Sequence, residues 1–136
     1  MKTVNVSAAV IVRNVGENKE ILLCERAHGE LSNCMEYVGG KIECGENPED
    51  AVVREVREEL LVNVKVDEKI GVIEHDYDTF HLTMHMYACS IVSGDITLTE
   101  HSSSQWVLVN KLDDPSITYA PADKKATVLV MEKYCK

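Results

Sequence analysis

The chain reads Gly40-Lys41-Ile42-Glu43-Cys44-Gly45-Glu46 and, after seven further residues, Arg54-Glu55-Val56-Arg57-Glu58-Glu59-Leu60-Leu61-Val62. The intervening residues carry the signals that start a helix. Asn47 is a favourable N-cap, and Pro48 suits the first helical position. We therefore predict a helix from Pro48 to about Leu60.

Three glutamates of this helix, Glu55, Glu58 and Glu59, stand at positions i, i+3 and i+4. At about 100° per residue they fall within roughly a third of the helix circumference. The adjoining face is an apolar stripe that can bury against a sheet: Val52, Val56 and Leu60. The spacing therefore predicts a cluster of carboxylates on one rim of an anchored helix.

Crowded carboxylates repel one another, by roughly 0.2–0.5 kcal/mol per close pair in an isolated helix. A cation offsets that repulsion, and Mg²⁺ accepts hard oxygen ligands together with water and substrate phosphates. The Gly39-Gly40 pair before the helix allows close approach of the backbone and can offer a carbonyl ligand. The alternative interpretation of the same glutamates is a solvated acidic helix face with internal ion pairs.

The full pattern resembles the Nudix box, Gly-x5-Glu-x7-Arg-Glu-aliphatic-x-Glu-Glu-x-Gly-aliphatic. The matching positions are Gly40, Glu46, Arg54, Glu55, Val56, Glu58, Glu59 and Val62. Leu61 stands where the family has glycine. We expect that position to close the helix in a left-handed conformation, which costs a non-glycine residue about 1–2 kcal/mol.

The resemblance extends over nearly the whole chain. Three further segments are similar to the MutT-related branch, and within it to CTP and other nucleoside triphosphate pyrophosphohydrolases: Glu74-His75-Asp76-Tyr77, Phe80-His81-Leu82-Thr83-Met84-His85 and Pro121-Ala122-Asp123. The resemblance implies a Nudix fold, a mixed sheet between helices in the α+β class. It also implies hydrolysis of a nucleoside triphosphate to a monophosphate and pyrophosphate, with Mg²⁺ as the cofactor and Mn²⁺ as a substitute.

The family's residue roles carry over to particular positions of this chain. The implied metal ligands are Gly39 through its carbonyl, Glu55, Glu58, Glu59, and Glu100 upstream of Trp106. Glu58 and Glu100 are the candidates for the general base. Arg54 and Glu46 complete the catalytic set, with the arginine either locking glutamates in place or holding phosphate.

Four residues are expected to bind substrate: Arg26, Lys41, His81 and Asp123. In the family pattern, Asp123 lies where the base is read. An ionised carboxylate only accepts hydrogen bonds, and cytosine offers an amino donor. We therefore favour CTP, dCTP or a 5-substituted cytidine nucleotide over 8-oxo-dGTP. The alternatives are an 8-oxo-dGTP diphosphatase, a Nudix nucleotide sensor without hydrolysis, and a plain helix-start acid at Asp123.

Composition excludes several other classes. The chain has 136 residues, 45% of them hydrophobic, and a formal net charge of −9, which argues against nucleic-acid polymers as partners. Its five scattered cysteines favour free thiols in a reducing compartment. No run approaches the ~20 apolar residues of a membrane span. We expect one domain over residues 1–136, cytoplasmic, without membrane contact, as a monomer or homodimer.

Periodicity predicts the remaining elements. Residues 3–13 and 20–26 form a hairpin, followed by a polar loop that ends at Val38-Gly39-Gly40. Residues 62–77 and 81–92 form two long strands joined near Asp78, and residues 105–110 form a short strand. Pro121 opens a final helix whose buried stripe is expected to contain Ala126, Leu129, Val130 and Cys135.

Overall fold

A computed structural model describes residues 1–135. The strands are β1 (Lys2–Val15), β2 (Asn18–Arg26), β3 (Met35–Glu36), β4 (Val38–Lys41), β5 (Asn63–Asp76), β6 (Phe80–Ser93) and β7 (His101–Leu108). The helices are α1 (Pro48–Leu60), the short 3₁₀ helix η1 (Val109–Lys111) and α2 (Pro121–Tyr134).

Strand β1 organises the sheet, whose order is β3-β2-β1-β6-β5. Residues 12–15 of β1 pair with β2 in the predicted hairpin, and residues 2–11 lie parallel to β6. Two strands lie off this path: β4 pairs with β1, and β7 pairs with β2. The β1–β6 pair is parallel and the other strand pairs are antiparallel, so the sheet is mixed as expected.

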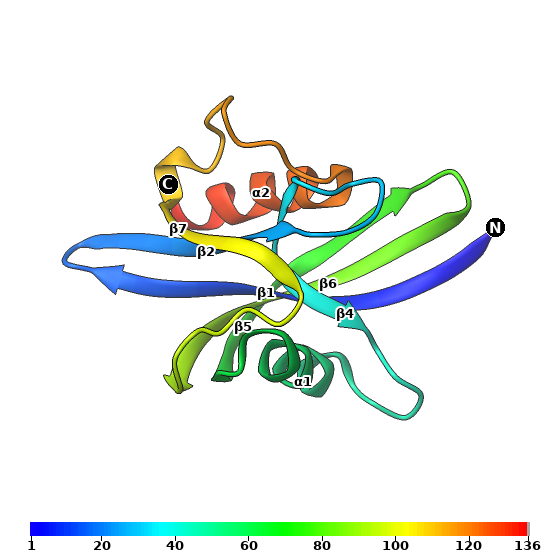
Figure 1. The fold of residues 1–136 in the computed structure, drawn as a ribbon, viewed down its shortest axis with the longest axis horizontal. Helices are drawn as coiled ribbons and strands as arrows, with labels where there is room; N and C mark the ends of the chain where they lie inside the picture. The colour runs from blue at the N-terminus through cyan, green and yellow to red at the C-terminus, as the bar shows by residue number, and fades with distance from the viewer. Residues whose placement is uncertain (136) are drawn as a thin grey trace.

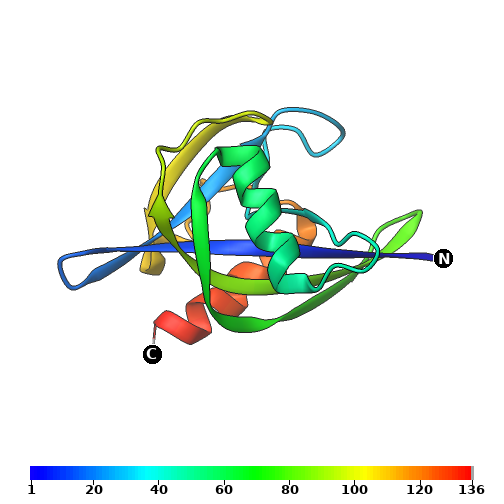
Figure 2. The same cartoon turned by 90° about the horizontal axis from the view of Figure 1, so that it is seen from below.

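The two helices cover opposite sides of the sheet, α2 above and α1 below in Figure 1. Seen from below, α1 crosses the strands (Figure 2). Each helix buries its own apolar cluster, with Val52, Val56 and Leu60 under α1 and Ala126 and Val130 under α2. The predicted α+β arrangement, a mixed sheet between helices, is confirmed.

Helix α1 begins and ends where the sequence predicts. The Asn47 side chain accepts a hydrogen bond from the Asp50 N–H at 2.8 Å, which satisfies one of the free donors of the first turn. Leu61 follows the last turn with φ 57° and ψ 30°, the left-handed conformation expected where the family has glycine. Its N–H donates to the Arg57 carbonyl at 3.0 Å, so the helix closes normally around a strained residue.

The strand predicted at residues 105–110 is wrong at both ends. Strand β7 begins at His101 and ends at Leu108, and residues 109–111 form η1. Near its start, β7 contains three consecutive serines, residues 102–104, a composition that suits a loop. In the structure the run pairs with β2, and the hydroxyls of Ser102 and Ser103 donate to Glu25.

Two other sequence expectations need correction. The polar loop before Val38 contains the two-residue strand β3, which pairs with β2. In α2, Cys135 is exposed and lies beyond the last helical residue. Ala122 takes its place in the buried stripe, because positions i, i+4 and i+8 share one face. Among residues 1–135, no helix combines the length and apolar character that crossing a bilayer requires.

We predict that Leu61→Gly stabilises the protein by about 1 kcal/mol, because glycine adopts a positive φ without strain. The melting temperature should rise by about 2–6 °C for a chain of this size. Leu61→Ala is the matched control: it keeps the strained backbone and should not stabilise. A rise with alanine equal to that with glycine would assign the effect to the exposed side chain instead of the backbone.

Candidate active site

The glycine pair of β4 brings the sheet against the carboxylates of α1. Gly39 and Gly40 lie opposite Ala8 and Ser7 of β1 in an antiparallel register. A Cβ at Gly40 would overlap the carboxylate of Glu55, and a Cβ at Gly39 would overlap the backbone of Ser7. Both positions therefore require glycine for close approach, and Glu55 rests directly over the strand.

Arg54 holds the loop between β4 and α1 onto the helix. Its Nε and Nη2 donate to the two carboxylate oxygens of Glu46 at 2.8 and 3.0 Å, and Nη2 also donates to the Lys41 carbonyl at 3.0 Å. Its Nη1 donates to Glu55 at 2.9 Å and to Glu58 at 3.2 Å. The Arg54 guanidinium also lowers the pKa of Glu46. These contacts fix the box loop and two of the predicted ligands with one side chain.

Glu59 differs from Glu55 and Glu58 in that Arg54 does not bind it. Its Oε2 is buried and has no hydrogen-bond partner among residues 1–135. Burial raises its pKa to about 7, and the charges of Glu55, Glu36 and Glu100 add to that shift while His101 opposes it. A buried carboxylate oxygen without a donor is costly, so a cation at this position would relieve it.

Glu100 is exposed and lies on a loop that is tied to the end of α1. The Thr99 N–H donates to the Glu59 carbonyl at 3.1 Å, and the Thr99 hydroxyl donates to the Glu58 carbonyl at 2.9 Å. The Thr97 N–H donates to the Leu60 carbonyl at 2.9 Å. The loop thus satisfies the free carbonyls of the helix end and brings Glu100 close enough to raise the pKa of Glu59.

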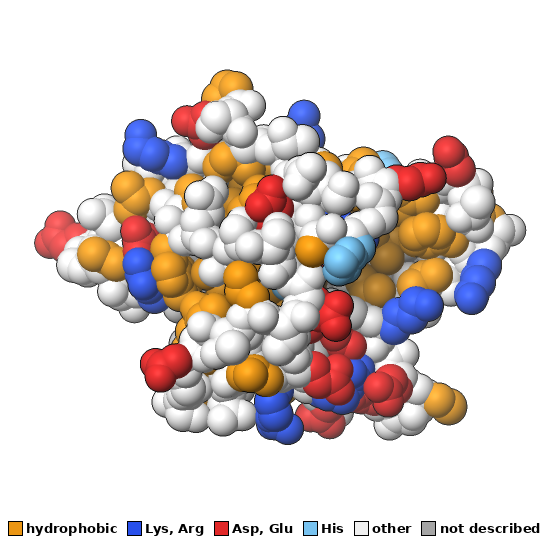
Figure 3. All heavy atoms as spheres, in the orientation of Figure 1, with side chains coloured by type: hydrophobic (Ala, Val, Ile, Leu, Met, Phe, Trp, Pro, Cys, Tyr) orange, Lys and Arg blue, Asp and Glu red, His pale blue; other side chains and the backbone are white. Residues whose placement is uncertain are grey.

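Acidic side chains gather on the surface where β4 leads into α1, with basic groups among them (Figure 3). Among residues 1–135, no three His, Cys, Asp or Glu side chains are already arranged as a metal site. Two of the predicted ligands, Glu55 and Glu58, are bound by Arg54. The donor set nevertheless fits a hard divalent cation: several carboxylates, a glycine carbonyl nearby and one unpartnered buried oxygen on Glu59.

A cavity of about 850 Å³ opens beside Glu59. Gly39, Gly40 and Glu59 line one end, and Asp123, Tyr77 and His75 are among the residues at the other. It therefore connects the carboxylates of α1 with the first turn of α2. A space of this size suits a small ligand.

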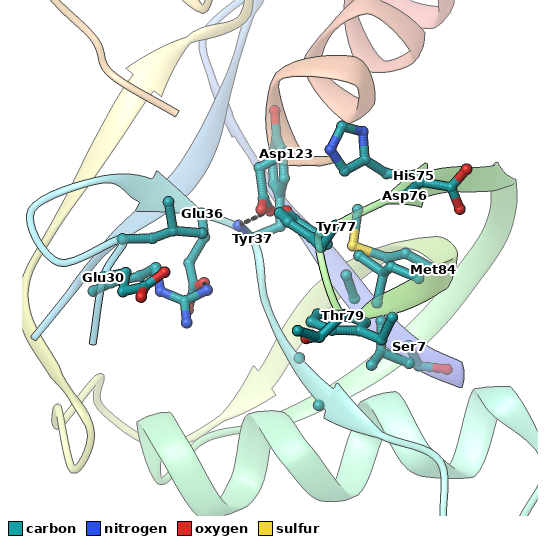
Figure 4. Close-up of a pocket in the computed structure, with 18 of the residues that line it drawn as sticks. Ser7, Glu30, Glu36, Tyr37, His75, Asp76, Tyr77, Thr79, Met84 and Asp123 are labelled. Carbon is teal, nitrogen blue, oxygen red and sulfur yellow. Dashed lines mark hydrogen bonds and ion pairs between the residues drawn. The ribbon is translucent and has the colours of Figure 1, made fainter. Parts of the chain in front are cut away.

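Asp123 projects from the first turn of α2 into the cavity, towards Tyr37 (Figure 4). Its Oδ1 accepts a hydrogen bond from the Tyr37 N–H at 3.1 Å. Burial, and then the charge of Glu36, raise its pKa to about 7. Tyr77 stands alongside and accepts from the Ala122 N–H at 3.2 Å. Asp123 is therefore a fixed cavity group that titrates near neutral pH.

Glu36 lines the same cavity and was missed by the sequence analysis. Arg26 donates to one of its carboxylate oxygens at 3.0 Å, and His101 lies 2.8 Å from the other. One weak signal was available in the sequence: Glu36 stands between the apolar residues Met35 and Tyr37-Val38. No comparable signal marked His101, whose partner is 65 residues away.

The predicted substrate residues divide into two groups. Arg26 and Asp123 line the cavity. His81 lies outside the lining: its ring is 2.6 Å from Asp76 and 3.1 Å from Glu74, on the other face of the β5–β6 hairpin. The Lys41 side chain is exposed and also lies outside the lining, and its carbonyl serves Arg54 instead.

The fold, the glycine pair and the carboxylate helix define a Nudix protein, and the chain belongs to this family: residues 3–129 match the NUDIX domain. It is 34% identical to the 8-oxo-dGTP diphosphatase of Escherichia coli K12 over 101 residues, 74% of this chain and 77% of the relative. It is 32% identical to the CTP pyrophosphohydrolase of the same organism over 124 residues, 90% of this chain and 87% of the relative.

Solved structures agree with this assignment. A MutT NUDIX hydrolase from Burkholderia pseudomallei superimposes with a TM-score of 0.82 at 25% identity, covering 96% of this chain and 99% of that one. The predicted enzyme class, a pyrophosphohydrolase of the Nudix family, is confirmed. Enzymes of this family use divalent metal ions such as Mg²⁺.

We predict that alanine impairs stability at one glycine of β4 and turnover at the other. Gly39→Ala meets backbone, which cannot move aside, and should destabilise the fold by about 3 kcal/mol. Gly40→Ala meets only the end of the Glu55 side chain, so stability should change by less than about 1 kcal/mol while turnover falls about tenfold or more. Chemical denaturation and a turnover assay on both variants test this. Equal effects of the two substitutions on stability would contradict the geometry.

Proposed function

We propose that this enzyme hydrolyses a nucleoside triphosphate to a nucleoside monophosphate and pyrophosphate with Mg²⁺, or with Mn²⁺ in its place. The observation that carries the proposal is the cavity, which has an unpartnered, buried carboxylate oxygen of Glu59 at one end and Asp123 at the other. One end suits a cation-bound triphosphate and the other suits a base. The whole chain is proposed to act as one domain in the cytoplasm.

Five residues are proposed to hold the metal: Gly39 through its carbonyl, Glu55, Glu58, Glu59 and Glu100. Bound magnesium supplies charge neutralisation for the triphosphate and lowers the pKa of a water molecule. Arg54 and Glu46 keep the box loop on α1, so the carboxylates are held in place before the substrate arrives. Glu58 and Glu100 are both exposed, and one of them is the proposed general base, although Glu58 also accepts a hydrogen bond from Arg54 at 3.2 Å.

Glu59→Gln should lower kcat/KM about a hundredfold or more, because the amide loses the charge that binds the cation. The same substitution should leave the protein, without added metal, at least as stable as the wild type, since it removes a buried charge. Saturating Mg²⁺ should raise the melting temperature of the wild type and not that of the variant. Pyrophosphate release and melting curves measure both effects. Near-normal turnover by the variant would remove Glu59 from the site.

We further propose that the base is cytosine. Asp123 and Glu36 place carboxylate oxygens on the cavity wall, and such acceptors suit the amino donor of cytosine. Two features favour a second candidate, 8-oxo-dGTP. A relative at 34% identity is named 8-oxo-dGTP diphosphatase, and a carboxylate can also accept from the N1–H and amino group of guanine.

A substrate panel distinguishes the two: CTP, dCTP, 5-methyl-dCTP, GTP and 8-oxo-dGTP. We expect the cytidine nucleotides to have the highest kcat/KM, and Asp123→Asn to change the order of substrates. Because the pKa of Asp123 is about 7, its accepting form prevails above that pH, so KM for CTP should fall as pH rises through 7. In Asp123→Asn that change in KM should become smaller, with only the contribution of Glu59 left. A wild-type preference for 8-oxo-dGTP, or an unchanged order in the variant, would contradict the cytosine proposal.

A further inference from the structure

His101 is a buried histidine that contacts Glu36, a residue of the cavity wall, without lining the cavity itself. Its side chain is 3% exposed, and it begins β7, directly after Glu100. Its Nε2 lies 2.8 Å from Oε2 of Glu36. A carboxylate oxygen accepts, so the ring donates its Nε2–H in this contact. His101 itself does not line the cavity, whereas Glu36 does.

The Glu36 carboxylate is held at both of its oxygens. Nη1 of Arg26 lies 3.0 Å from Oε1, while His101 occupies Oε2. Two donors from different strands leave the carboxylate no freedom to rotate, because β2 supplies Arg26 and β7 supplies His101. The remaining lone pairs of both oxygens are available to a ligand in the cavity.

A purely structural role explains His101 poorly. Its second ring nitrogen, Nδ1, is buried and has no hydrogen-bond partner among residues 1–135. A buried polar atom without a partner is costly, and an apolar side chain of similar size would fill the space without that cost. The one hydrogen bond of the ring is made to Glu36, a residue of the cavity wall.

We propose that His101 is a positioning residue that fixes the Glu36 carboxylate as a hydrogen-bond acceptor for the amino group of a nucleobase. The inference rests on the proposed function, in which the cavity takes a nucleotide. Through its neighbour Glu100, the same loop also reaches the carboxylates of α1. The segment that contains Glu100 and His101 would then serve both ends of the cavity. It supplies Glu100 at the carboxylate end, and through His101 it positions Glu36 at the end that takes the base.

Two substitutions isolate the hydrogen bond. His101→Leu fills the space without a donor, and His101→Gln restores an N–H at a similar reach. We expect His101→Leu to raise KM for the preferred triphosphate about tenfold with kcat changed less than about threefold, because binding is lost equally in the ground and transition states. His101→Gln should return KM to within about threefold of the wild type. Equal KM values for Leu and Gln would overturn the proposal.

His85→Leu is the matched control. His85 also has a buried Nδ1 without a partner among the described residues, and it lies on β6 outside the cavity lining. Its substitution should leave KM and kcat unchanged, which separates the loss of a buried imidazole from the loss of the Glu36 contact. A KM increase for His85→Leu equal to that for His101→Leu would show a general effect on packing and overturn the assignment.

A double-mutant cycle tests whether His101 acts through Glu36. In a Glu36→Ala background, His101→Leu should change KM by less than about twofold, because the contact it removes is already absent. If His101→Leu keeps its full effect in that background, the ring acts by another route and the proposal fails.

Two binding measurements separate this inference from the proposed function. Mn²⁺ titrated alone, followed by electron paramagnetic resonance, should bind His101→Leu within about twofold of the wild type, whereas a parallel loss of Mn²⁺ affinity would assign the ring to the metal end. The α,β-methylene analogue of CTP, titrated calorimetrically, should bind the variant about tenfold more weakly. If the wild type binds the analogue but cleaves no triphosphate, hydrolysis is refuted while the affinity ratio still decides the role of His101. Absence of binding to the wild type would refute both.

Discussion

The bidentate contact between Arg54 and Glu46 is the interaction on which the carboxylate end of the molecule depends. It connects a helix to the loop that precedes it, and so it fixes where β4 can lie relative to α1. From the same guanidinium, further donors reach the Lys41 carbonyl, Glu55 and Glu58. The close approach of β4 to Glu55 at Gly40 is therefore maintained by the contacts of Arg54, and the glycine only leaves room for it.

Two acids with similarly raised pKa values lie at opposite ends of one cavity. Both Glu59 and Asp123 owe the shift mainly to burial, and both have carboxylate neighbours that add to it. The structure keeps each near the point of ionisation around pH 7. A ligand that brings cationic character to Glu59 and a donor to Asp123 relieves both costs together, so binding energy is available at each end of the cavity.

The sequence predicted what is local and missed what is paired at long range. The bounds of α1 and its Asn47 cap follow from adjacent residues, and the left-handed Leu61 follows from the resemblance to the Nudix box; all agree with the structure. Glu36 and His101 are neighbours because β3 and β7 both pair with β2, a register that no short pattern encodes. The start of β7 was predicted wrongly for the same reason, because the serine hydroxyls can donate to Glu25 only when β7 is paired with β2. His81 was expected in the cavity because the face of a strand cannot be assigned until its partner is known.

The contact between Asp123 and the Tyr37 amide joins residues 86 positions apart, whereas the contacts of Arg54 span at most 13. Contacts between distant residues form late in folding, because the loop they close must first lose its entropy. The carboxylate helix with its loop can therefore acquire its shape while α2 is still unstructured. During synthesis, a nascent chain that has emerged only as far as β6 already contains the box but has no closed cavity. The wall of the cavity that Asp123 supplies therefore forms only when α2 docks on the sheet.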